Sequence, residues 1–531
     1  MLKRMSQIFI IFFLISCNKG SGNFAPIKEI LCADPQSRGG LTVGLNLETL
    51  KLLAAILGTD KGQNINSASV LNDDLVLKTL NQALITSGVK PEVLNILSVS
   101  SVVPGDTVRF LKIGGDYAPG FGVAARLFKA IASQSPQMQN LFQFIHESVR
   151  VSITDADFTS QLKSVSPKQW ALKQTDFAQT QTIVGRPSRE VIVAVIDTGV
   201  DLNHPDLKNV LVPGYNFVDN NETPQDGNGH GTHCAGIIAA QGLSGPDAPI
   251  GVASGINIKI MPIKVLSDNG SGSTQNIEKG IRWAVAHNAD VISMSLGGGL
   301  EYSDAKSAGG LNNEIVNDAI AKGTVVVVAA GNEKCPLGGK CTEPNGFFSS
   351  KFEEYTVLPC SYEGTICVGA TDYDENLAAY SNYSSQKTNT NYRTHADVNA
   401  PGTNIWSTWP TKLNGPYKAI SGTSMATPYV AGVAAILKAQ STATEPVNQQ
   451  MVLQYLRKGA VQWAPAVQKS EAGRVDLYRT AAYFGREYLK RTDIPDPGVS
   501  APKPLPQPEI PGDNGKSPPL NSLWDFLCSV P

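Results

Sequence analysis

Between residues 166 and 489 the chain alternates short apolar runs with longer stretches of helical periodicity. The apolar runs predict strands at 191–196, 259–265, 290–294, 324–330 and 365–369. The stretches between and after them predict helices at 232–240, 273–287, 312–322 and 429–438. Continuous apolar strands separated by helices are typical of a parallel sheet covered on both faces. We therefore predict an α/β domain with a central, mainly parallel sheet, whose ligand site lies at the carboxyl ends of strands.

Residues 41–165 have a different pattern, which predicts a small α+β module. Helical runs are predicted at 48–57, 73–87 and 124–133, and alternating strands at 107–113 and 148–153. A module of this kind directly before a larger domain suits a pro-segment, which would make the chain a zymogen. The alternative is an accessory domain without an inhibitory role.

The first 16 residues have the pattern of an export signal. Lys3 and Arg4 precede an apolar run at 8–15, which is too short to span a membrane as a helix. The segment ends in Leu-Ile-Ser-Cys17, which resembles the bacterial lipobox. That resemblance implies cleavage before Cys17, a lipidated tether over 17–40 and anchoring to a bacterial membrane. The alternative is an ordinary signal peptide with an incidental cysteine.

The residue after the lipobox cysteine and the other end of the chain complete this picture. Asn18 does not match the aspartate that retains lipoproteins at the inner membrane, so the outer membrane is favoured over the inner one. Residues 490–531 are proline-rich and predict a semi-rigid linker with a short apolar tail. The 531-residue chain has a net charge of −2, which argues against nucleic acid as a partner. We expect a monomer, held on a membrane by its lipid or released after processing.

An exported chain can form disulfides. Cysteines that lie close together in loop-like sequence predict two bonds, Cys335 with Cys341 and Cys360 with Cys367. Spacing alone does not determine connectivity. Cys32 and Cys528, near opposite ends of the chain, are a further possible pair, and Cys234 is expected to be a free, buried thiol.

Three polar residues stand in positions suited to nucleophilic catalysis. Asp197 ends the first strand of the α/β region, His230 lies between two glycines, and Ser424 opens a helix rich in small residues. An imidazole with a pKa of about 6.5 suits proton transfer near neutral pH. A turn aspartate and an N-cap serine are the structural alternatives. A metal site on His230 and His233 lacks a third ligand at helical spacing.

Taken together, the blocks around these residues resemble the subtilisin-like serine proteases, the subtilases. Asp, His and Ser follow in that family's order, and the resemblance extends over residues 168–485. The matching blocks are 197–199, 228–236, 265–272, 292–298, 327–333 and 422–426. The resemblance implies a subtilisin-like three-layer α/β fold and peptide bond hydrolysis through an acyl-enzyme intermediate.

The resemblance also assigns roles to individual residues. Ser424 is expected to attack the scissile carbonyl, His230 to transfer its proton, and Asp197 to hold the imidazole. Asn332 matches the side-chain donor of the oxyanion hole. Two strands are expected to sandwich an extended substrate through main-chain hydrogen bonds. Their residues are Gly270, Ser271 and Gly272 on one side and Ser295, Leu296 and Gly297 on the other.

Main-chain recognition makes a broadly specific endopeptidase acting on polypeptides the leading hypothesis. The alternatives are a narrow processing protease of surface proteins and an inactive binding protein on the same fold. Cys234 follows the second histidine as in the proteinase K-like branch, which implies sensitivity to mercurials without a catalytic role. Asp206 resembles a carboxylate that ligates calcium in many subtilases, in a structural and not a catalytic site. A pro-segment would be cut between about residues 160 and 186, and we expect the cut just before Trp170.

Overall fold

The structure is a computed structural model in which the described residues fall into six short segments and one long one. The short segments are 40–45, 76–77, 95–100, 108–114, 142–147 and 150–153. The long one is 169–498, interrupted at 185–188, 246, 308–312, 346–347, 386–394, 414, 442–444 and 462–472. The chain divides into two compact units, described separately below. Cys17, Cys32, Cys528, the signal, the tether and the C-terminal tail lie outside the described residues. Among those described, no helix is long and apolar enough to cross a membrane.

The first unit contains a four-stranded antiparallel sheet with strand order β2-β3-β1-β4. Its strands are β1 Gly40–Leu45, β2 Asn95–Ser100, β3 Val108–Gly114 and β4 Phe142–Glu147. The predicted strand at 107–113 is confirmed as β3. Of the predicted strand at 148–153, residues 150–153 are described and form β5 Arg150–Ile153. β1, β2 and β4 were not predicted, and each pairs with a strand elsewhere along the chain.

The three helices predicted in the N-terminal module are mostly untested. The runs at 48–57 and 124–133 lie outside the described residues, and of 73–87 only residues 76 and 77 are described, both helical. The same compact unit also includes residues 272–286 and 303–314. Two helices fall there, α9 Thr274–Ala286 and most of α10 Tyr302–Ser307.

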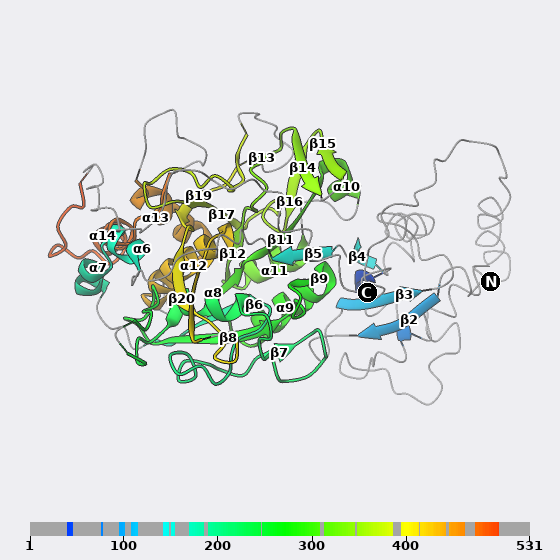
Figure 1. Ribbon diagram of the computed structural model, residues 1–531, viewed down its shortest axis with the longest axis horizontal. Coiled ribbons are helices and arrows are strands. Elements are labelled where there is room, and N and C mark those ends of the chain that lie inside the picture. The colour runs from blue at the N-terminus through cyan, green and yellow to red at the C-terminus, as the bar shows by residue number, and fades with distance from the viewer. Residues whose placement is uncertain are drawn as a thin grey trace. The chain divides into compact units, whose positions relative to one another are not determined.

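The second unit is built on a seven-stranded sheet with order β19-β17-β12-β10-β6-β8-β7 (Figure 1). Every neighbouring pair in this sheet is parallel. The strands are β6 Val191–Asp197, β7 Tyr215–Asn216, β8 Ile258–Lys264, β10 Val291–Met294, β12 Val325–Ala329, β17 Ile366–Thr371 and β19 Val398–Pro401. All five strands predicted in this region are confirmed, each within two residues of its predicted ends.

Helices flank this sheet, as the apolar runs predicted. The sequence-based helices of this unit appear as α8 His230–Ala239, α11 Glu314–Ala321 and α12 Thr423–Ala439, and the predicted helix at 273–287 is α9 of the first unit. The remaining helices are α6 Trp170–Gln174, α7 Phe177–Val184, α13 Gln449–Gly459 and α14 Leu477–Glu487. The α/β architecture with a central parallel sheet is therefore confirmed.

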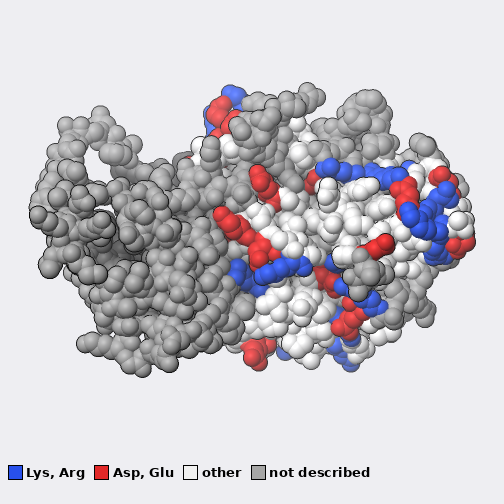
Figure 2. Space-filling view, turned by 180° about the vertical axis from the view of Figure 1, so that it is seen from behind, with Lys and Arg blue, Asp and Glu red and all other residues white. Residues whose placement is uncertain are grey.

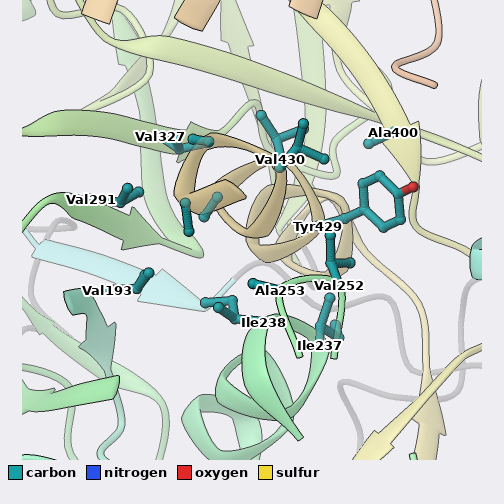
Figure 3. Close-up of a cluster of buried hydrophobic side chains, with 14 of the residues drawn as sticks. Val193, Ile237, Ile238, Val252, Ala253, Val291, Val327, Ala400, Tyr429 and Val430 are labelled. Carbon is teal, nitrogen blue, oxygen red and sulfur yellow. The ribbon is translucent and has the colours of Figure 1, made fainter. Parts of the chain in front are cut away.

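The register of the sheet explains why its strands are apolar throughout. Val291 pairs with Val193 on one side and with Val325 on the other, so alternate valines of three strands line one face. Figure 3 shows Val193, Val291 and Val327 facing Val430 of α12 and Ile238 of α8. The residues between these valines are also buried, on the opposite face. Burial on both faces removes the polar positions that a half-exposed strand would carry.

Helix α12 packs directly on the sheet and on α8 because its side chains are small. All 17 of its residues are buried. A Cβ at Gly432 would lie 2.8 Å from the Cβ of Val252, so a larger residue would push the helix away. The close packing keeps the start of α12 beside the carboxyl ends of the central strands. Ser424 lies at that start.

Shorter strands complete the second unit. They are β11 Leu296–Glu301, β13 Pro336–Leu337, β14 Cys341–Asn345, β15 Phe348–Phe352, β16 Tyr355–Leu358, β18 Tyr383–Ser384, β20 Ile405–Thr408 and β21 Tyr417–Ile420. Both predicted disulfides are present, Cys335 with Cys341 and Cys360 with Cys367. On the face seen in Figure 2, acidic and basic side chains are interspersed over the described residues, with no broad area of one sign.

Candidate active site

Asp197 lies where the strand order of the central sheet reverses. The chain moves from β6 to β8 on one side and then to β10 on the other side of β6. A crevice forms outside the carboxyl ends of strands at such a point. Asp197 is the last residue of β6, and its side chain is fully buried there. Its Oδ1 accepts hydrogen bonds from the Thr198 N–H at 2.7 Å and from Nδ1 of His230 at 2.7 Å.

His230 begins helix α8 and is likewise fully buried. Two glycines, one on each side of His230, allow the close packing that this position requires. A Cβ at Gly231 would lie 2.1 Å from the Gly199 carbonyl, and one at Gly229 would lie 2.3 Å from the Trp409 ring. The two glycines therefore admit the close protein neighbours that bring the imidazole to Asp197. A carboxylate on Nδ1 fixes the tautomer that leaves Nε2 to accept a proton.

Asp226 joins the turn after Asp197 to the helix of His230, and sequence reasoning missed it. It is buried, and its Oδ1 accepts from Thr198 Oγ1, Asn228 N–H and Gly229 N–H, each at 2.9 Å. Its Oδ2 accepts from the N–H and the hydroxyl of Thr232 at 3.0 and 2.6 Å. Burial raises the pKa of Asp226, and these hydrogen bonds oppose that shift. An aspartate four residues before a catalytic histidine was the available signal.

Ser424 is the second residue of α12 and is fully buried. The N–H groups of a first helical turn have no partner within the helix, and the positive end of the helix dipole lies beside them. Its Oγ donates to the Ser295 carbonyl at 3.2 Å. The predicted nucleophile is therefore held at a helix start, next to the strand expected to bind substrate.

Asn332 is oriented as an oxyanion-hole donor should be. Its Oδ1 accepts hydrogen bonds from the N–H and the hydroxyl of Thr423, both at 2.9 Å. Its Nδ2 is buried and has no hydrogen-bond partner in the described part of the chain. A buried donor without an acceptor is costly and rare. Negative charge developing on a substrate oxygen beside Ser424 would supply the missing acceptor.

One of the two predicted substrate strands, β11, pairs with an extended segment of the chain itself. β9 Ser271–Ser273 and β11 belong to a four-stranded sheet with order β16-β11-β5-β9. Within the second unit, Ile153 of β5 pairs antiparallel with Leu296, and Ser152 pairs with Gly297. Gly270 and Ser295 immediately precede β9 and β11. β11 therefore pairs with an extended segment of the chain through main-chain groups, and its pairing with a substrate stays a prediction.

His233 and Cys234, which follow the catalytic histidine, are structural. The Nε2 of His233 bonds the carbonyls of Ile405 and Lys418, and burial lowers its pKa to about 3, so the ring is neutral. Cys234 is a free, buried thiol, as predicted, and burial raises its pKa to about 11.

The potential ligand atoms of Cys234, Asp197 and His230 lie within 4.8 Å of one another. At neutral pH the protonated thiol is a hydrogen-bond donor and a poor metal ligand. A soft heavy metal that displaces the thiol proton would bind against the catalytic pair. Inhibition by mercurials therefore stays a prediction.

The surroundings of Asp206 do not fit the calcium site predicted there. The carboxylate is fully buried and accepts from the N–H groups of Leu243 and Ser244 at 2.6 and 3.1 Å. The Tyr417 hydroxyl donates to its other oxygen at 2.6 Å. Calcium needs six to eight oxygen ligands, whereas these three neighbours are donors. Asp206 instead fastens the loop after α8, and calcium at another site stays a prediction.

The structure thus pairs the imidazole of His230 with the Asp197 carboxylate and places Ser424 at a helix start next to Thr423, which bonds Asn332. This geometry supports the proton transfers of acyl transfer from Ser424 through His230. The fold and the site define a serine peptidase.

Comparisons with known proteins agree with this class. Residues 188–474 match the subtilase family, Peptidase_S8. Thermitase of Thermoactinomyces vulgaris is 38% identical over 298 residues, which cover 55% of this chain and 88% of thermitase. Subtilisin DY of Bacillus licheniformis is 38% identical over 266 residues, 50% of this chain and 82% of that protein. A crystal structure of a cold adapted subtilisin-like serine proteinase aligns at 31% identity with a TM-score of 0.42, covering 54% of this chain and 88% of the other.

The chain belongs to the subtilase family, because the family match spans more than half of it. It is a subtilisin-like serine endopeptidase. The resemblance inferred from its sequence motifs is therefore confirmed.

Replacing Asn332 by leucine is expected to lower kcat by about 10²- to 10³-fold, the range known for this donor in subtilisin. The side chain keeps its approximate size but loses Nδ2, whose acceptor forms only as charge develops on the substrate oxygen. KM should therefore change little. Steady-state kinetics on a peptide p-nitroanilide measure both constants. A rise in KM at unchanged kcat would instead make Asn332 a ground-state binding residue.

Proposed function

We propose that the protein is an exported, lipid-anchored endopeptidase of broad specificity, synthesised as a zymogen. Three observations support export and anchoring: the signal-like residues 1–16, the lipobox-like Cys17 and the two disulfides of the second unit. Disulfides persist in oxidising compartments outside the cytosol. Outer-membrane placement follows from Asn18 as argued above.

Broad specificity is supported by the way β11 binds its neighbour. The pairing of β5 with Leu296 and Gly297 uses main-chain groups, which every polypeptide carries. Profiling of cleavage sites in a denatured protein mixture tests this. Cleavage after many different residues is expected, whereas a single sequence motif would favour the narrow processing protease.

The observation that carries the zymogen proposal is the position of β5. Within the second unit, a segment of the chain pairs with β11 in the strand position that a substrate would take. Asp197, His230 and Ser424 are also each fully buried, as expected for an occupied cleft. We infer that the region before residue 166 blocks the enzyme until it is cut. The accessory-domain alternative gives no reason for β5 to pair there.

The register of β5 favours a first cut on the N-terminal side of Trp170. Ile153 pairs with Leu296, so the next position along an antiparallel strand falls opposite Ser295. The Ser295 carbonyl lies 3.2 Å from Ser424 Oγ. A segment that continues in this register would present the bond between Thr154 and Asp155 to the nucleophile. We propose this bond as the first cut, with trimming toward Trp170 as a later step.

Intact mass spectrometry of protein expressed from Asn18 onward tests these proposals. The wild type should lose its N-terminal region, start at Asp155 and take up one fluorophosphonate adduct. A Ser424→Ala variant should stay full length and unlabelled. A first fragment starting at Trp170 would restore the sequence-based cut. A labelled wild type that stays full length would favour the accessory domain, and a folded wild type that is neither cut nor labelled would favour the inactive binding protein.

Membrane anchoring is tested separately by fractionating bacterial cells that produce the full chain. The wild type should sediment with membranes and a Cys17→Ser variant should not. Equal sedimentation of the two would contradict a lipid anchor at Cys17.

A further inference from the structure

The carbonyl group of Ser424 occupies an unusual position within helix α12. In a regular helix it would accept a hydrogen bond from the N–H four residues further along. That residue is Pro428, which lies inside the helix and has no N–H. Ser424 is fully buried, so its carbonyl needs donors from elsewhere in the protein. The nucleophile is therefore the residue whose backbone is released from the helix ladder.

Two side chains from other elements donate to this carbonyl. Ser295 Oγ lies 2.8 Å from the Ser424 carbonyl oxygen, and Cys234 Sγ lies 3.5 Å from it. Both donors are buried. Cys234 lies on α8, the helix that begins with His230, and Ser295 lies between β10 and β11. The carbonyl therefore links the helix of the nucleophile to the helix of the base and to the strand that binds extended polypeptide.

Ser295 makes a second contact with the same residue, in the opposite direction. Its own carbonyl accepts a hydrogen bond from Ser424 Oγ at 3.2 Å. Each serine hydroxyl thus donates to the carbonyl of the other. One contact holds the backbone of the nucleophile and the other holds its hydroxyl, so Ser295 constrains both the position and the rotamer of the reacting group.

We propose that the Ser295 side chain is a positioning residue for the nucleophile. By donating to the carbonyl that receives no N–H from Pro428, it sets the Ser424 backbone and so the direction of Oγ toward the reacting carbonyl. Because Ser295 directly precedes Leu296, binding of an extended substrate on β11 also aligns the nucleophile. Misplacement of a reacting group by about 1 Å can cost on the order of 10²-fold in rate.

The structural alternative is that Ser295 merely satisfies a buried polar group and stabilises the fold. The two roles differ in what they affect. A stabilising residue changes the melting temperature and leaves kcat of the folded enzyme intact. A positioning residue changes kcat well below the melting temperature, and any other donor placed on the same carbonyl restores kcat.

The chain offers such a second donor. A Pro428→Ala variant supplies an N–H at the position from which a helix normally donates to the Ser424 carbonyl. Ser295→Ala alone is expected to lower kcat and the fluorophosphonate acylation rate by about 10-fold, with KM little changed. Pro428→Ala alone should stay within about 3-fold of wild type, and Ser295→Ala with Pro428→Ala should recover most of the loss.

The control is Ser293→Ala, two residues earlier on β10. Ser293 is buried like Ser295, but its Oγ has no hydrogen-bond partner among the described residues, so kcat should not change. All rates are measured on the form that active wild-type protein adopts, full-length or processed. If the wild type is itself inactive, the proposed function fails and not this inference. An unchanged kcat in Ser295→Ala, or a lost kcat that Pro428→Ala does not restore, would overturn the positioning role.

Discussion

Ser424→Ala is expected to lower kcat by about 10⁶-fold, the loss known for the nucleophile of subtilisin. The reason is that the other groups of the site converge on the Ser424 Oγ. Ser424 opens α12 beside the Ser295 carbonyl, with Thr423 holding the oxyanion donor Asn332. No described neighbouring group in this arrangement can attack the substrate in place of the Ser424 oxygen. Residual hydrolysis by water should persist at about 10³- to 10⁴-fold over the uncatalysed rate.

The measurement is hydrolysis of a peptide p-nitroanilide, together with loss of covalent labelling by a fluorophosphonate. Ser361→Ala is the matched control, since Ser361 is fully buried and its Oγ bonds no group in the part of the chain that the structure describes. The control should keep wild-type kcat. Retention of labelling in Ser424→Ala would show that another residue is the nucleophile.

Asp197→Asn is expected to lower kcat by about 10⁴-fold at neutral pH, with little change in KM. Oδ1 of Asp197 accepts from Nδ1 of His230 at 2.7 Å, in a site where neither side chain is exposed. An asparagine carries a donor in place of one carboxylate oxygen. When its amide faces Nδ1, the ring takes the tautomer with the proton on Nε2, and the base can no longer accept a proton from Ser424.

Loss of the buried charge has a second effect in the same direction. The imidazolium that forms during the reaction is no longer stabilised by a carboxylate in a site of low dielectric. Steady-state kinetics, with circular dichroism to verify the fold, measure the loss. Asp318→Asn is the matched control, because that carboxylate is partly exposed and pairs only with Lys322 on the same helix and its C-terminal turn. A loss below about 10-fold in Asp197→Asn would mean that another group orients the base.

The local sequence pattern was sufficient to predict the strands of the catalytic domain, because these strands are buried on both faces. Strand β6, for example, follows from a run of apolar residues with no competing helical periodicity. In the first unit, β1 and β2 were missed for the opposite reason, since their short runs mix glycine, serine and asparagine with apolar residues. Their pairing with β3 depends on residues far away in the chain.

Two site details also required spatial information. The calcium prediction at Asp206 rested on a local motif, but the donors around the carboxylate come from residues 243, 244 and 417. The cut before Trp170 rested on resemblance to the start of a mature enzyme. The proposed bond after Thr154 rests on the strand register with Leu296.

The sequence by itself determined the α/β class, the order of its strands and helices, and the identities of Asp197, His230, Ser424 and Asn332. These features are encoded in short stretches whose periodicity and motif are complete within a few residues. Only the tertiary structure decided that Asp226 joins the first two of these residues and that Ser295 holds the third. Such contacts join residues up to 129 positions apart. Their geometry depends on how whole elements pack, which no local pattern records.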